Sequence, residues 1–128
     1  MKTLLLVKFV VELLAGLAFL IFPSALFLIL LGIPLDAPGA YAFRMFGAAV
    51  LAIAIACWLA REDSVSKTAS GLVTATAFYD FVFLAILLAA RFVGGLSGVG
   101  LWPTVIVHLG LGGSSLFCLR RGSVVRVG

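Results

Sequence analysis

Four long apolar runs constrain this chain more than any other feature. Each run is long enough to cross the hydrocarbon core of a bilayer, which is ~30 Å thick and takes about 20 residues of helix. The composition agrees, because 64% of the 128 residues are hydrophobic and 11% are charged, whereas a soluble domain has about 45–50% and about 25%. The expected fold is all-α, a polytopic membrane four-helix bundle that forms a single integral membrane domain over residues 1–128.

The first apolar run, Leu4 to Leu31, is too long for one straight span, because a helix of that length would reach roughly 42 Å. Pro23 disfavours helix at the residue before it, and Ser24 can cap a new start. We therefore expect a first span followed by a short helix at the membrane interface. The predicted spans are 4–22, 40–60, 68–90 and 101–119, with the interfacial helix at 24–31.

The N-terminal segment also resembles a secretory signal peptide, with a lysine near its start, an apolar stretch and then small residues. Glu12 interrupts the apolar stretch, so we expect the segment to be retained as the first span.

Basic residues are distributed unequally between the two ends of the predicted spans. Four spans place both termini on one side, and the positive-inside rule makes that side the cytoplasm of the inner (plasma) membrane. Basic residues at span ends meet lipid headgroups, so the expected partners are membrane lipids and not nucleic acid. The basic residues on the terminal side are Lys2, Arg61, Lys67, Arg120, Arg121 and Arg126, with Lys8 close by.

Each predicted span carries one ionisable residue inside its apolar run: Glu12, Arg44, Asp80 and His108. A charged side chain at the centre of a transmembrane helix costs ~2.5–3.5 kcal/mol when it stands alone. Turning these side chains toward one another lowers that cost, which predicts a polar pocket inside the bundle.

The expected contacts in this pocket follow from position along the spans. We expect Asp80 to face the bundle interior and to approach at least one of Arg44, His108 and Tyr79. Arg44 enters from the outer side and can hold Asp80 in a forked pair, while Lys8 lies one helical turn before Glu12 and can reach it. Three local alternatives stay open: Glu12 pairing with Lys8 alone, Arg44 snorkelling to the interface, and His108 serving only in packing. The predicted pocket residues are Glu12, Arg44, Thr76, Tyr79, Asp80, His108 and Ser115.

Small residues indicate where helices approach closely in lipid. The second span carries alanines four residues apart from Ala48 to Ala60, and the fourth carries small residues over 110–115, so we expect these to be contact faces. Cys57 and Cys118 lie far apart without a CxxC motif, and we expect free thiols and no metal site.

The segments FPSALFLILLGIPLDAPGA, RMFGAAVLAIAIACWLAR, FYD and WPTVIVHLGLGG resemble a broad group of small four-helix bacterial inner-membrane proteins, loosely the DoxX group. This resemblance implies a four-helix bundle and no established chemistry. Small multidrug transporters also have four spans and a glutamate in the first, similar to Glu12, but the additional Asp80, His108 and Arg44 fit them poorly.

The leading functional hypothesis is a binding protein or accessory subunit whose pocket holds a small amphipathic molecule, lipid-like or quinone-like. The alternatives are a proton-coupled small transporter with Glu12, Asp80 and His108 as proton carriers, and an intramembrane enzyme acting on a lipid-like substrate with His108 and a carboxylate as acid and base. No cofactor is predicted; haem would receive one axial ligand from the single histidine. A homo-oligomer or a larger membrane complex is compatible with this composition.

Overall fold

The computed structural model describes the backbone of residues 1–125 and the side chains of residues 1–121. Within this range the chain forms five helices, of which four are long and apolar enough to cross a membrane. The predicted all-α bundle is therefore confirmed. The helices are α1 (Lys2–Ile21), α2 (Pro23–Leu31), α3 (Ala37–Ala60), α4 (Lys67–Phe92) and α5 (Leu101–Val125).

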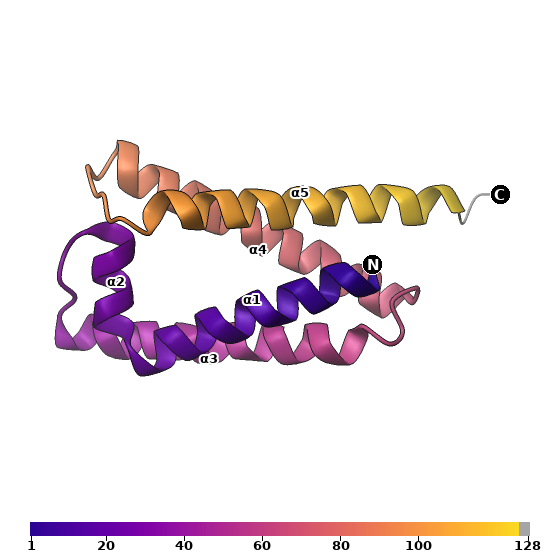
Figure 1. Cartoon of the computed structure of the whole chain (residues 1–128), viewed down its shortest axis with the longest axis horizontal. Coiled ribbons are helices and arrows are strands. Elements are labelled where there is room, and N and C mark those ends of the chain that lie inside the picture. Colours follow the sequence, from indigo (N-terminus) through magenta and orange to yellow (C-terminus); the bar gives the residue numbers. More distant parts are fainter. Residues whose placement is uncertain (126–128) are drawn as a thin grey trace.

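The break at Pro23 occurs where the sequence predicts it. Phe22 has φ −123° and ψ 50°, which is not helical, and Pro23 occupies the first position of α2, where a missing N–H costs nothing. Helix α2 ends at Gly32, whose φ of 76° is the left-handed conformation that glycine adopts most easily. The short helix therefore stands across the ends of the long helices instead of continuing α1 (Figure 1).

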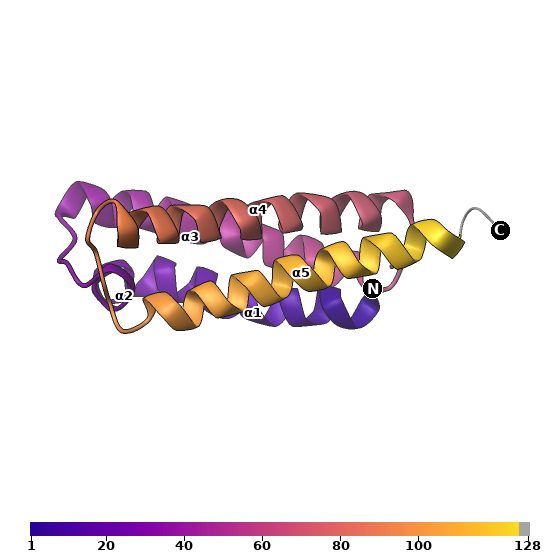
Figure 2. The ribbon, with the colours of Figure 1, turned by 90° about the horizontal axis from the view of Figure 1, so that it is seen from above.

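The long helices are arranged as two layers, with α1 packed on α3 and α4 packed on α5 (Figures 1 and 2). The contact between α1 and α3 is close because glycines face each other: a Cβ on Gly47 would lie 2.9 Å from the Gly16 carbonyl oxygen and 2.8 Å from the Leu20 nitrogen. Ala48 and Ala52 are exposed. The expectation that the alanine series forms the contact face of this helix is wrong for these two residues, because the buried face consists of Gly47, Val50, Ala54 and Cys57, while Ala60 packs against the core at the end of the helix.

Helix α2 joins the two layers at one end of the molecule. Its last carbonyls accept backbone hydrogen bonds from the α4–α5 loop: Ser97 N–H to Leu31 (3.0 Å), Gly98 N–H to Leu30 (3.2 Å) and Gly100 N–H to Ile29 (2.8 Å). These bonds satisfy carbonyls that a helix end leaves without partners. The approach needs glycine, because a Cβ on Gly98 would lie 2.1 Å from the Ile29 oxygen.

The N-terminus and the end of α5 lie at the opposite end of the molecule, beside the α3–α4 loop (Figure 1). There Lys2 Nζ donates to Glu62 Oε2 at 2.9 Å, and this hydrogen bond lowers the pKa of the exposed Glu62 carboxyl. The structure thus places the N-terminus, the α3–α4 loop and the end of α5 at one end, as an even number of spans requires.

Two apolar clusters fill the ends of the bundle. The cluster at the terminal end contains Leu4, Leu5, Cys57 and Val73, with Cys118 packed against it. Both cysteines are free thiols that serve in packing. The cluster at the α2 end contains Leu87, Leu101 and Val105. Asp80 of α4 and His108 of α5 lie between these clusters along the sequences of their helices.

Candidate functional site

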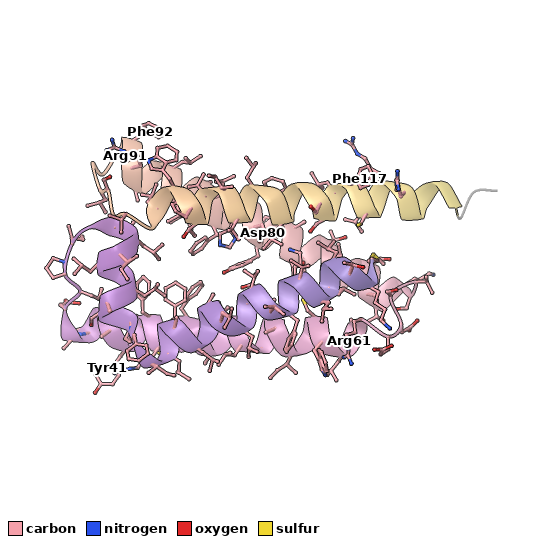
Figure 3. The ribbon with its side chains drawn as sticks, in the orientation of Figure 1. Tyr41, Arg61, Asp80, Arg91, Phe92 and Phe117 are labelled. Atoms are coloured by element: carbon pink, nitrogen blue, oxygen red, sulfur yellow. The ribbon has the colours of Figure 1, made fainter. Side chains whose placement is uncertain are left out.

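Asp80 is fully buried and lies between the two layers, where two other helices supply its hydrogen-bond donors (Figure 3). Lys8 Nζ of α1 donates to Oδ2 at 2.5 Å, and His108 Nδ1 of α5 lies 3.0 Å from Oδ1. Lys8 is itself 0% exposed. In an apolar interior such charge-assisted bonds satisfy groups that would be costly to bury alone.

The pairing with Asp80 orients the His108 ring. An ionised carboxylate only accepts, so Nδ1 carries the hydrogen that is donated to Asp80 Oδ1. His108 is therefore held in one ring orientation by a residue that is in turn held by Lys8.

Glu12 is also buried, yet its Oε1 has no hydrogen-bond partner among the described residues. It lines a partly open cavity of about 120 Å³. This volume is close to that of an engineered apolar cavity of ~150 Å³ that holds benzene. The cavity wall is formed by Val11, Glu12, Ala15, Ala18 and Phe19 of α1, Leu26 and Leu30 of α2, Tyr79 and Phe83 of α4, and Thr104 and His108 of α5.

Aromatic rings surround the polar end of this cavity. The ring of His108 packs on Phe83 with centroids 4.6 Å apart and on Tyr79 at 5.8 Å. Phe19 closes the α1 side and packs on Phe46 at 5.1 Å. A ligand in the cavity would meet aromatic faces and aliphatic side chains, with Glu12, Tyr79, Thr104 and His108 as the polar groups in its wall.

The structure brings together part of the predicted pocket. Glu12, Tyr79 and His108 line the cavity, and Asp80 supports His108. Thr76 and Ser115 are buried, but their hydroxyls donate to the carbonyls of Val73 and Leu111 in their own helices. These two residues therefore complete the packing of their helices and do not line the cavity.

Arg44 does not pair with Asp80, so of the two arrangements considered for Arg44 the structure shows the one at the outer end of the span. Arg44 is exposed, and its Nε donates to the Leu20 carbonyl at 3.3 Å. Its guanidinium lies 5.6 Å from the ring centre of Tyr41, which Figure 3 shows on the outer side of the molecule. The Leu20 carbonyl is one of the last in α1 and has no acceptor role inside the helix. Arg44 therefore donates to a carbonyl at the end of α1, and the cation that pairs with Asp80 is Lys8.

Sequence reasoning missed the partner of Lys8 and the contribution of α2. Lys8 was expected to reach Glu12 because the two residues are four apart on one helix, but the contact with Asp80 across the layers forms instead. Leu26 and Leu30 enter the cavity wall because α2 turns across the bundle, which no residue pattern within 24–31 indicates. Within residues 1–121 no group of three or more potential ligands could hold a metal ion.

We compared the chain with protein-family models, with curated proteins and with solved structures, and none of them matches it. The functional argument therefore depends on the geometry of the site.

Proposed function

We propose that this is a multi-pass membrane protein that binds the polar end of one small amphipathic molecule, lipid-like or quinone-like, in the cavity between Glu12 and His108. The observation that carries the proposal is the unpartnered Glu12 Oε1, buried at the wall of an otherwise largely apolar cavity. Buried polar groups in native proteins are nearly always hydrogen-bonded, so one that faces a cavity indicates a missing partner.

The shape of the cavity supports a ligand with one compact polar end. Its volume accommodates one ring or one headgroup, and because it is partly open the remainder of the molecule can extend outward. Cavities that bind small molecules combine apolar walls with a few polar groups that fix orientation. Here Glu12 and His108 have that role, and Asp80 and Lys8 hold His108 in place.

Identification of co-purified molecules tests this proposal. We expect mass spectrometry of the purified protein to detect a bound small molecule that is absent after Ala15→Leu, because the larger side chain fills the cavity that Ala15 lines. Ala85→Leu on the exposed surface of α4 is the matched control and should retain the molecule. Equal amounts in all three proteins, or none in the wild type, would contradict the proposal.

Proton-coupled transport is the second candidate, and the contact series Lys8–Asp80–His108 favours it. Proton carriers in membranes are acidic and histidine side chains in hydrogen-bonded contact, and His108 connects such a series to the cavity wall. In vesicles that contain the protein and a pH-sensitive dye, ligand uptake should then move protons, and Asp80→Asn should abolish this movement while the protein stays folded. Uptake without proton movement would exclude the coupling.

For the location, we propose the plasma membrane with both termini in the cytoplasm. The end of the molecule that carries the termini also carries Lys2, Arg61, Lys67, Arg120 and Arg121, whereas Arg44 and Arg91 lie toward the other end. The positive-inside rule assigns the more basic end to the cytoplasm.

A further inference from the structure

We propose that the ligand is a long-chain alcohol, a neutral molecule whose hydroxyl group enters the cavity beside Glu12 and His108 and whose single chain lies in a groove between α1 and α5. This inference rests on the ligand-binding function proposed above and names the chemistry of the ligand and a second site for its chain.

The groove between α1 and α5 has a volume of about 510 Å³. Leu4 and Leu111 are buried and form its floor, whereas Val7 and Val107 are half exposed and form its sides. Gly110 leaves further room in the α5 wall, because a Cβ at this position would meet nothing within 4 Å. Side chains of this kind are as apolar as a lipid chain, so the groove suits an alkyl chain.

The groove and the cavity are adjacent along both helices. Val11 of α1 lines both of them, and on α5 Val107 of the groove precedes His108 of the cavity. From Val11 the groove continues along α1 to Thr3, which is about 12 Å along the helix axis toward the terminal end of the molecule. A molecule whose polar end is held in the cavity can therefore place its chain in this groove.

The sizes of the two spaces favour a ligand with one chain. The cavity of about 120 Å³ accommodates the polar end only, so the apolar remainder has to leave it. The groove is bounded by one face of each of two helices and meets the cavity at Val11. One chain fits this arrangement better than the two chains of a diacyl lipid.

The polar groups of the cavity wall favour a hydroxyl at the other end of the ligand. Glu12 Oε1 has no partner among the described residues, and a carboxyl group accepts when it is ionised and also donates when it is protonated. His108 Nδ1 is engaged with Asp80, which leaves Nε2 for a ligand, as a donor or as an acceptor according to the charge of the ring. A hydroxyl both donates and accepts, so it satisfies Glu12 and His108 in every protonation state, whereas a carbonyl group only accepts.

The test uses a long-chain primary alcohol that carries a photoreactive diazirine in the middle of its chain. It is added to the wild type in phosphatidylcholine nanodiscs, and mass spectrometry identifies the labelled residues after irradiation. We expect most of the label on residues 3–11 and 106–114, and little on the exposed face of α3 around Met45. An excess of 1-hexadecanol should suppress this labelling, whereas hexadecane, which lacks the hydroxyl, should not.

Two variants of α5 test the groove itself. Gly110→Leu fills the groove and should lose most of the label on residues 3–11 and 106–114. Gly113→Leu is the matched control, because its Cβ also meets nothing within 4 Å but the residue does not line the groove, and it should be labelled as the wild type is. Thermal unfolding establishes that both variants are folded.

Two results would overturn the inference. Label spread evenly over all exposed faces indicates ordinary contact with lipid, and equal suppression by 1-hexadecanol and hexadecane means that the hydroxyl is not recognised.

A second alcohol, with the diazirine next to its hydroxyl, separates these failures from a failure of the cavity. If this probe labels residues 11–19 while the first probe does not label the groove, the cavity binds the alcohol and the chain site is wrong. If neither probe labels the protein specifically but another molecule co-purifies, only the identity of the ligand is wrong. If in addition no molecule co-purifies, the ligand-binding function fails as well.

Discussion

A carboxylate in the middle of an apolar helix needs hydrogen-bond donors, and Asp80 obtains them from two neighbouring helices. Lys8 and His108 come from α1 and α5, one from each layer of the bundle. Because all three side chains are at least nine-tenths buried, the ion pair is screened much less than an exposed pair. The contact therefore links the α1–α3 layer to the α4–α5 layer at the centre of the molecule.

The first prediction concerns the Lys8–Asp80 ion pair. Removing either partner alone, by Lys8→Met or Asp80→Asn, leaves the other buried without its partner and should destabilise the protein by ~3–5 kcal/mol. The double variant should lose clearly less free energy of unfolding than the sum of the losses of the two single variants. Unfolding in denaturant measures all three free energies.

Arg44→Met provides the control for this cycle. Arg44 contacts the end of α1 and not Asp80, so combining Arg44→Met with Asp80→Asn should give additive losses. Strong coupling of Arg44 with Asp80, and none of Lys8 with Asp80, would show that the contacts described here are wrong.

The second prediction concerns Glu12, whose buried oxygen lacks a partner. Glu12→Gln removes a carboxyl whose Oε1 makes no hydrogen bond among the described residues. We therefore expect its effect on the free energy of unfolding to stay within ~1 kcal/mol, well below that of Asp80→Asn. Thermal unfolding of the two single variants in the same detergent checks the order, and a larger loss for Glu12→Gln would indicate a structural role.

The sequence predicted the depth of each ionisable residue but not its direction around the helix axis. Asp80 was expected to approach at least one of Arg44, His108 and Tyr79, because no lipid group satisfies a carboxylate at that depth, and it contacts His108. The cation that pairs with Asp80 could not be predicted, because Lys8 and Arg44 could both reach the pocket by their positions along the spans. Arg44 is kept away from Asp80 because α1 packs closely on α3 and the Leu20 carbonyl accepts a hydrogen bond from Arg44. Only the folded chain brings this carbonyl beside Arg44.

At the scale of the helices, glycine sets the distance between α1 and α3. Gly16 and Gly47 face each other, and a Cβ on either would lie 3.0 Å or less from atoms of the other helix. Small residues were correctly expected to mediate packing, but Ala48 and Ala52 of the alanine series are exposed. Small residues that recur every four positions identify one face of a helix. The pattern does not tell whether lipid or another helix covers that face.

The third prediction tests this close approach. Gly47→Ala places its Cβ 2.8 Å from the backbone nitrogen of Leu20. Because this neighbour is backbone and not a flexible side chain, it cannot move aside, and the two helices must separate. Such overpacking costs typically ~1–3 kcal/mol. Gly113→Ala is the matched control in α5, because its Cβ would meet nothing within 4 Å. The thermal midpoint should fall for Gly47→Ala only, and an equal fall for both would reject the close contact.

At the scale of the whole molecule, the cavity lies where the two layers and α2 meet. The layers touch through the buried ion pair, and α2 is fixed to the α4–α5 loop by backbone hydrogen bonds. The number and approximate bounds of the four spans could be predicted from hydropathy, because each span must satisfy its own backbone, and Pro23 predicted the separate short helix. The cavity could not, since it depends on the direction in which α2 turns after Pro23.

The last prediction concerns the orientation of the molecule in the membrane. The end that contains the termini and the α3–α4 loop carries most of the basic residues, so it should face the cytoplasm. Single cysteines introduced as Asp63→Cys and Val99→Cys report on the two ends, because both positions are exposed. Cys57→Ala and Cys118→Ser remove the native thiols. A membrane-impermeant maleimide added to intact cells should label the cysteine at 99 and not the one at 63, whereas both should react after the cells are broken. The reverse pattern would place the termini outside, and labelling of both in intact cells would indicate two orientations.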